Sequence, residues 1–275
     1  MENAGSAGRL MISNVSEIWQ EIEQKTQQFV NLNLQQNLNY EKYAIYSIVT
    51  HSTAIEGSAL TEPEAELLFD DGLTAKGKPL VHHLMNIDLK NAYIFAAEQA
   101  KKKPVLTPEY LKTLNALVMK NTGSVTSTMG GDFDSSKGDF RLCGVTAGIG
   151  GKSYVNHLKI PEKMERFCEK LNMELTVDPQ NSDLRRLYDI TFNAHLDLAT
   201  IHPWIDGNGR TARLLMNFLQ LYFKLCPTKT FVEDRVEYIA SLRESQDTKN
   251  NAYFLKFMAL EHLKTLNREI SASRH

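Results

Sequence analysis

The chain has 275 residues, of which 42% are hydrophobic and 23% are charged, and its formal net charge is -2. This composition is ordinary for a globular protein, and the near-neutral charge gives no general electrostatic reason to expect nucleic acid as a partner. The three cysteines, Cys143, Cys168 and Cys226, are widely spaced and form no C-x-x-C pair. They predict neither a disulfide framework nor a zinc site, and a reducing compartment suits them best.

The chain also lacks the hydrophobic segments that direct proteins to or through membranes. Its first residues, MENAGSAGRLMIS, contain no continuous apolar stretch of the kind found in signal peptides. No later segment approaches the roughly eighteen uninterrupted apolar residues of a membrane-spanning helix. We therefore expect a cytoplasmic protein with no membrane partner and no nucleic-acid partner.

Apolar residues recur at helical spacing through most of the chain, which predicts an all-α fold. Two amphipathic segments cover 18–30 and 43–49, and Pro63 followed by acidic residues opens a third helix. Thr107-Pro108-Glu109 is typical of a helix start, and Gly123 follows as a stop. Further helical patterns cover 85–96, 161–171, 183–201 and 253–263.

The middle of the chain departs from this pattern. Eight of the fifteen glycines fall between Gly123 and Gly151, together with the short β-favouring pieces RLCGV (141–145) and SYV (153–155). These features predict a mobile loop and a β-hairpin. The sequence GIGGKS (148–153) is similar to a phosphate-binding P-loop, but Thr146 stands where that motif needs its first glycine. We therefore interpret it as a loop without that function.

The stretch HPWIDGNGRTAR (202–213) has the composition of a tight turn before a helix. The preceding helix must end at Ile201, because the residue before Pro203 is pushed out of the helical conformation. Helical spacing resumes just after Gly209. Glycines at 207 and 209 allow backbone N–H groups to converge at the positive end of the new helix, which predicts an anion site.

The charged residues of this stretch suit a polyphosphate. Arg210 and Arg213 share one helix face, and each guanidinium can contact two phosphate oxygens. Asp206 would repel an anion unless a cation such as Mg²⁺ lay between them. His202 can accept a hydroxyl proton near neutral pH. Each residue alone is more often structural, yet together they predict attack of a hydroxyl on phosphorus.

This stretch resembles the signature of the Fic family, H-P-F-x-D-G-N-G-R-x-x-R, with Trp204 in place of phenylalanine. The resemblance continues through AHLDLATI before the motif, LLMN after it, GDFR (138–141) and IPEKMERF (160–167), and covers about 100–265. It implies a helical bundle with a β-hairpin flap. It also implies transfer of AMP from ATP to a Ser, Thr or Tyr hydroxyl of a target protein.

Carried onto this chain, the resemblance implies a role for each residue of the motif. His202 would be the general base and Asp206 the Mg²⁺ ligand, with ATP as co-substrate. The α- and β-phosphates would lie on Gly207, Asn208 and Gly209. Arg210 would assist at the β-phosphate, and Arg213 would hold the γ-phosphate.

The same resemblance implies a docking flap and an adenine-side contact. An extended segment of the target would add as a strand at the flap, which maps to Val145, Thr146, Ala147 and Gly148. Tyr238 has the spacing of an adenine-side contact, whereas Gln246 stands where asparagine is common. His195 lies seven residues before His202, too far for a two-histidine metal site on one helix, and we interpret it as a core residue.

A second stretch, STAIEG (52–57), resembles the inhibitory motif [S/T]-x-x-x-E-[G/N] of Fic proteins that carry an N-terminal inhibitory helix. Ser52, Glu56 and Gly57 are its matching residues. If Glu56 pairs with Arg213, it occupies the guanidinium that the γ-phosphate needs. We expect residues 1–100 to form a helical region that carries this motif and packs on a catalytic core, 101–275.

Other functions remain compatible with the sequence. The site could remove AMP from a modified protein with Glu56 positioning a water, or transfer another phosphate-containing group. A regulator that binds nucleotide without turnover is the alternative from another class. The target protein, which could be the chain itself, and the oligomeric state are left open, although a homodimer that covers the site is a familiar arrangement among relatives of this kind.

Overall fold

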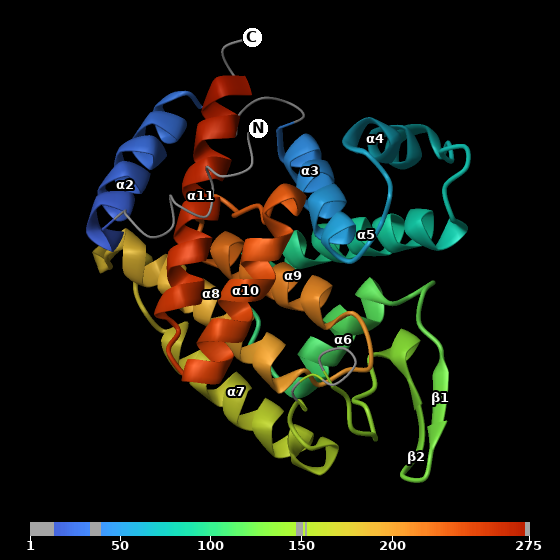
Figure 1. Ribbon diagram of the computed structural model, residues 1–275. Coiled ribbons are helices and arrows are strands. Elements are labelled where there is room, and N and C mark those ends of the chain that lie inside the picture. The colour runs from blue at the N-terminus through green and yellow to red at the C-terminus, as the bar shows by residue number, and fades with distance from the viewer. Residues whose placement is uncertain (1–13, 34–39, 147–150, 152, 273–275) are drawn as a thin grey trace.

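The computed structural model describes residues 14–33, 40–146, 151 and 153–272. Ten α-helices dominate these residues, and two short antiparallel strands lie at the edge of the helical assembly (Figure 1). The all-α architecture with a small hairpin is thus confirmed. None of the helices in the described ranges combines the length and the apolar character needed to cross a bilayer.

The elements follow the predicted order closely. The helices are α2 (Val15–Asn31), α3 (Tyr40–Ile55), α4 (Glu62–Asp71), α5 (Leu80–Lys102), α6 (Pro108–Val118), α7 (Ile160–Glu174), α8 (Leu184–Ile201), α9 (Asn208–Tyr222), α10 (Arg235–Thr248) and α11 (Ala252–Ala272). The strands are β1 (Val125–Thr128) and β2 (Gly131–Asp134), paired in register with Val125 opposite Asp134.

The start signals read from the sequence act as expected. Helix α6 begins with Pro108, and the Thr107 side chain accepts a hydrogen bond from the backbone N–H of Tyr110. Helix α4 has Thr61 at its N-cap, whose backbone N–H donates to Glu64 Oε2 at 2.9 Å. Such side-chain contacts satisfy backbone groups that have no partner inside the helix.

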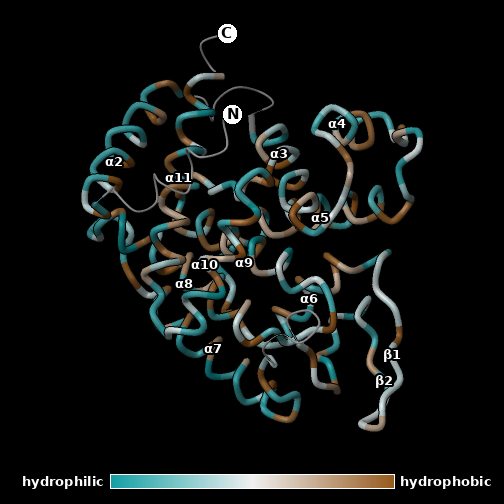
Figure 2. The backbone as a smooth tube through the Cα atoms, in the orientation of Figure 1, coloured by the Kyte–Doolittle hydropathy of each residue, from teal (hydrophilic) through white to brown (hydrophobic). Residues whose placement is uncertain are grey.

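Helix α9 lies at the centre of the fold and is buried along most of its length. It packs against α5, α6 and α8, and its apolar residues belong to a core cluster built with α5, α6, α7 and α8. A second cluster joins α2 and α11 to α8 and α10. Hydrophobic and hydrophilic residues alternate along these helices in Figure 2. The central position of α9 gives its N-terminal turn a rigid base.

The β-hairpin predicted for the glycine-rich region is confirmed, and its strands lie within 125–134. The pieces RLCGV and SYV form no strand, and a single bridge joins Ser153 of the second piece to Thr146, which follows the first. Helix α10 was not predicted from the sequence. Its buried residues are only Tyr238 and Ser245, so its sequence lacks the apolar stripe by which an amphipathic helix is recognised.

Candidate active site

The site is built on the turn that joins α8 to α9. Helix α8 ends at Ile201, and His202 adopts a left-handed conformation with φ of 52°, while Pro203 prevents the helix from continuing. Trp204 is fully buried, and its indole N–H donates to the carbonyl of Gly138 at 2.9 Å. The turn is therefore anchored in the core two residues after the candidate base.

The side chain of Asn208 closes the turn. Its Oδ1 accepts from the backbone N–H of Trp204 at 3.1 Å, and its Nδ2 donates to the Trp204 carbonyl at 2.9 Å. Gly207 has φ of 77°, and a Cβ atom there would collide with Asn115 and Met119. Among the residues that the structure describes, no side chain caps the N-terminus of α9. The first N–H groups of α9 are consequently available to an anion, whereas the Asn208 amide is engaged within the turn.

His202 is held in a neutral state by its surroundings. Burial lowers its pKa to about 4, helped by the positive charge of Arg141 and opposed by a hydrogen bond with the Ala199 backbone. The Tyr154 ring stacks on the imidazole with a centroid distance of 3.8 Å and an interplanar angle of 12°. At neutral pH the imidazole can therefore accept a proton, which is the state that a general base requires.

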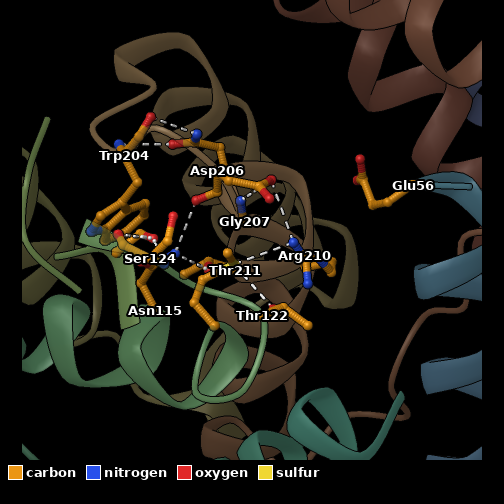
Figure 3. Close-up of polar contacts among 12 residues, drawn as sticks. Glu56, Asn115, Thr122, Ser124, Trp204, Asp206, Gly207, Arg210 and Thr211 are labelled. Carbon is orange, nitrogen blue, oxygen red and sulfur yellow. Dashed lines mark hydrogen bonds and ion pairs between the residues drawn. The ribbon is translucent and has the colours of Figure 1, made fainter. Parts of the chain in front are cut away.

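Arg210 is a buried cation with unused hydrogen-bonding capacity. It is 1% exposed, and its Nη2 lies 3.4 Å from Asp206 Oδ1 and 3.2 Å from Met119 Sδ. Within the described residues, its Nε and Nη1 have no hydrogen-bond partner. Asp206 also accepts from the Gly207 N–H, and its side chain is 67% exposed (Figure 3). Unpaired buried donors are rare in folded proteins and indicate a place for an anion.

Arg213 is also buried, but its donors are occupied. Its Nε donates to Ser52 Oγ at 2.8 Å, and its Nη2 donates to the Ser52 carbonyl at 2.9 Å and to Glu56 Oε1 at 2.6 Å. Its Nη1 donates to the Tyr238 hydroxyl at 3.1 Å. Burial alone would lower the pKa of Arg213, yet the interactions with Tyr238 and Glu56 raise it above its usual range. The structure thus brings together Arg213 and the predicted motif at 52–57.

The carboxylate of Glu56 covers the first turn of α9. A Cβ atom at Gly209 would collide with Glu56 Oε1 and would lie 3.2 Å from Arg213 Nη1. Gly57 follows with φ of 99°, a left-handed conformation that suits glycine at the end of α3. Glu56 therefore occupies the space over the first turn of α9 that the missing side chain of Gly209 leaves open.

Behind Arg213 lies a buried pair of aromatic residues. The Tyr238 hydroxyl is 2.9 Å from His195 Nε2, and Tyr238 is 2% exposed. Burial, with a smaller effect of Arg213, lowers the pKa of His195 to about 3. His195 is fully buried, as expected for a core residue. The Tyr238 hydroxyl is engaged inside the protein, and its adenine-side role stays a prediction.

These groups adjoin a cavity of about 850 Å³. Glu56, Gly209 and Arg213 line one part of it, and His202 lines another. Helix α10 contributes a further part of the wall, namely Tyr238, Ile239, Leu242, Arg243, Gln246 and Asp247. Its volume lies within the usual range for small-molecule sites. Asp206 and Arg210 are not among the described residues that line it.

The candidate flap lies at the mouth of the same cavity. Thr146 forms a bridge with Ser153, and the Tyr154 N–H donates to the Val145 carbonyl at 3.1 Å. Of the four predicted docking positions, Ala147 and Gly148 lie outside the described residues. Ser153 and Tyr154 line the cavity, so this segment and His202 share one space.

Two residues that contact the site were not singled out in the sequence. Tyr154 stacks on His202, and Arg141 hydrogen-bonds to the His202 carbonyl at 2.9 Å. Arg141 is the last residue of the GDFR segment, where a lone arginine among apolar neighbours was the available signal. Tyr154 carried no signal, because its proximity to His202 arises only when the loop folds back.

Comparison with known proteins finds sequences and structures similar to this chain. Residues 105–220 match the Fic/DOC family model. The chain is 26% identical over 238 residues to protein adenylyltransferase fic-1 of Caenorhabditis elegans, covering 85% of this chain and 42% of that protein. It is 28% identical over 229 residues to protein adenylyltransferase Fic of Drosophila grimshawi, covering 82% of this chain and 43% of that protein. The chain thus spans less than half the length of these relatives.

Solved structures share the fold. Fic-1 (aa134–508) from C. elegans superimposes with a TM-score of 0.75 at 22% identity, covering 94% of this chain and 73% of that one. A Fic domain containing signaling protein from Bacteroides thetaiotaomicron superimposes with a TM-score of 0.77 at 19% identity, covering 92% of this chain and 97% of that one. The motif on the turn between α8 and α9 lies within 105–220, the part of the chain that matches the Fic/DOC family model.

Proposed function

We propose that this chain is a protein adenylyltransferase, which transfers AMP from ATP to a hydroxyl of a target protein, and that Glu56 inhibits it. The names of the relatives support the activity, and the site supports its chemistry. One observation carries the proposal. Within the described ranges, the Arg210 guanidinium is buried with two unpaired donors. It lies beside a helix N-terminus that no described side chain caps, next to the turn that carries the neutral His202.

The reaction needs few groups from the protein. The hydroxyl oxygen of the target attacks the α-phosphorus of ATP, and the bond from that phosphorus to the oxygen bridging to the β-phosphate breaks. Pyrophosphate leaves, and the hydroxyl proton passes to His202. Because burial keeps this imidazole neutral, it can take the proton without first losing one.

The triphosphate would lie on the first turn of α9. The backbone of Gly207, Asn208 and Gly209 would cradle the α- and β-phosphates, since the helix dipole favours negative charge there. The Gly207 N–H, which donates to Asp206 Oδ1 in the structure, would leave that carboxylate to do so. The free Nε and Nη1 of Arg210 would reach the β-phosphate, and Arg213 would hold the γ-phosphate. Asp206, with its exposed carboxylate, would hold Mg²⁺, which neutralises phosphate charge when bound.

The flap would align the target with the α-phosphate. Val145 and Thr146 lie on the segment that pairs with Ser153 and Tyr154, and an extended peptide would add to this segment as a further strand. Since Tyr154 contacts the His202 ring, a target hydroxyl presented there would lie near the base. Ala147 and Gly148 complete the proposed docking positions.

Inhibition would act through competition for one guanidinium. Helix α3 packs against α5 and α9, and its end brings Glu56 to Arg213 and over Gly209. While Glu56 is there, the γ-phosphate has no cation, and ATP binds without its α-phosphate aligned for attack. We therefore propose that 1–100 serves as an inhibitory region on a catalytic part, 101–275, with Ser52 holding Arg213 in place.

Parallel labelling with α-³²P-ATP and γ-³²P-ATP tests the function, using Glu56→Gly protein and cell extract. Transfer of AMP predicts label on protein from the α-labelled nucleotide alone. Label from γ-³²P-ATP alone would mean phosphorylation. Label from neither would contradict AMP transfer and favour AMP removal or nucleotide binding without turnover.

A further inference from the structure

Arg141 is a buried arginine that no carboxylate neutralises within the described part of the chain. It is 1% exposed, in a segment without regular structure that follows the hairpin. A buried charge is costly unless hydrogen bonds compensate it, so its partners indicate its role. All of the described partners of this guanidinium are backbone carbonyls.

These carbonyls come from three separate stretches of chain. Nε donates to the His202 carbonyl at 2.9 Å, Nη1 to the Cys143 carbonyl at 2.6 Å, and Nη2 to the Val155 carbonyl at 2.5 Å. The backbone N–H of Arg141 also donates to the Pro203 carbonyl at 3.0 Å. One side chain thus ties both sides of the flap segment to the turn that carries the candidate base.

The flap segment contacts His202 a second time through a ring. Tyr154 stacks on the imidazole, and its backbone N–H donates to the Val145 carbonyl. His202 has a left-handed φ of 52°, a conformation that costs energy for a residue with a side chain. Contacts that hold its carbonyl and its ring therefore decide where the imidazole points.

We propose that Arg141 is a positioning residue, which links the flap to His202 so that the base is aligned only while the flap holds its bonded shape. This inference rests on the proposed adenylyl transfer, in which the target docks on the flap and His202 takes its proton. Docking and proton transfer then depend on one guanidinium, although Arg141 touches neither nucleotide nor target. The geometry of a flat guanidinium explains why arginine stands here, since an ammonium cannot reach three carbonyls in one plane.

The electrostatics of His202 agree with this geometry. The charge of Arg141 acts with burial to lower the pKa of His202, while Glu56 and Asp206 act in the opposite direction. Arg141 thus both orients the imidazole and favours its neutral form.

Two substitutions separate these effects, each made in the Glu56→Gly background. Arg141→Gln removes the charge and most of the donors, whereas Arg141→Lys keeps the charge and removes the planar arrangement of donors. Arg166→Gln serves as the matched control, because Arg166 is exposed on α7 and pairs only with Glu162 among the described residues. The readouts are kcat and KM for ATP, and the titration of His202 by NMR.

We expect both Arg141 variants to lower kcat by about 10- to 100-fold, since a misplacement of about 1 Å can cost on the order of 10²-fold. KM for ATP should stay within about twofold, because the phosphate-binding groups are untouched. The pKa of His202 should rise in Arg141→Gln and stay low in Arg141→Lys. A general loss of structure would instead weaken nucleotide binding as well, and Arg166→Gln should change nothing.

A kcat within about twofold of the parent in Arg141→Lys would overturn the proposal. If Arg141→Gln fails to fold, as judged by circular dichroism, the Arg141→Lys variant decides alone. If the parent shows no transfer, the proposed function fails separately. The link between the flap and His202 is then tested without activity. An unchanged hydrogen-exchange rate of the Tyr154 amide in Arg141→Lys would refute it, and so would an unchanged pKa of His202 in Arg141→Gln.

Discussion

Replacing Glu56 with glycine should activate the protein by releasing Arg213. The substitution removes the 2.6 Å ion pair from Glu56 Oε1 to Arg213 Nη2 and uncovers the first turn of α9 at Gly209. Arg213 keeps its contacts with Ser52 and Tyr238, so its guanidinium remains in position for a phosphate. The variant therefore frees a preformed anion site, and nothing else in the described site has to move.

The size of the effect follows from what the γ-phosphate must displace. A hydrogen bond to a charged group contributes about 1.5–3 kcal/mol. The Glu56 side chain is 35% exposed, so solvent weakens the pair and the lower part of that range applies. About 1.5–2 kcal/mol corresponds to roughly a 10- to 30-fold gain in productive ATP binding. We expect AMP incorporation at subsaturating ATP to rise by this factor.

The assay is incorporation of label from α-³²P-ATP with Mg²⁺, together with calorimetric titration of ATP. Glu56→Gln, which keeps the shape and removes the charge, should show an intermediate gain. Glu41→Gln is the matched control, because Glu41 is exposed in the first turn of α3, and it should behave as the wild type does. Equal incorporation by wild type and Glu56→Gly would refute inhibition by this ion pair.

Three further predictions follow from the site. His202→Ala in the Glu56→Gly background should lower incorporation by at least about 10²-fold, the usual loss for a general base, and unchanged labelling would exclude that role. Gly209→Ala should displace Glu56 without activating the protein, since the new methyl group also fills the anion site; strong labelling would contradict this. Burial lowers the pKa of both His195 and His262 to about 3, so the unfolded chain binds their protons first, near the ordinary value of 6.5. The stabilisation from these neutral histidines is therefore complete above pH 6.5 and is lost as the pH drops toward 3. The free energy of unfolding should fall by on the order of 2 kcal/mol for each histidine between pH 6.5 and 5. Equal free energies of unfolding in urea at pH 7 and pH 5 would refute this prediction.

The sequence was sufficient to predict the elements that neighbouring residues specify. Pro203 ends α8 wherever the helix lies, and the glycines around Asn208 permit a turn whose N–H groups begin α9. Threonine and proline at 107 and 108 specify a helix start by the same kind of neighbour interaction. These elements could be predicted because each depends on residues within about one helical turn.

Sequence patterns were insufficient to predict the elements that depend on contacts with distant parts of the chain. Helix α10 has few buried residues, so no apolar stripe marks it, and the hairpin formed at 125–134 although stronger β-favouring residues lay further on. β-Strands depend on cross-strand contacts more than on composition, which explains why those residues form no strand. The inhibitory role proposed for Glu56 rests on a resemblance, and its ion pair with Arg213 joins residues 157 positions apart.

The order of residues by itself determined that a helix ends at position 201, that a second begins after a glycine turn, and that the turn has the composition for binding phosphate. Only the tertiary structure decided which of the two arginines is already occupied. It left Arg210 with unpaired donors, surrounded Arg213 with partners from α3 and α10, and tied His202 to the flap through Arg141. The physical reason is that a buried charge is governed by whichever groups the packing of distant helices brings to it, and no local pattern records that choice.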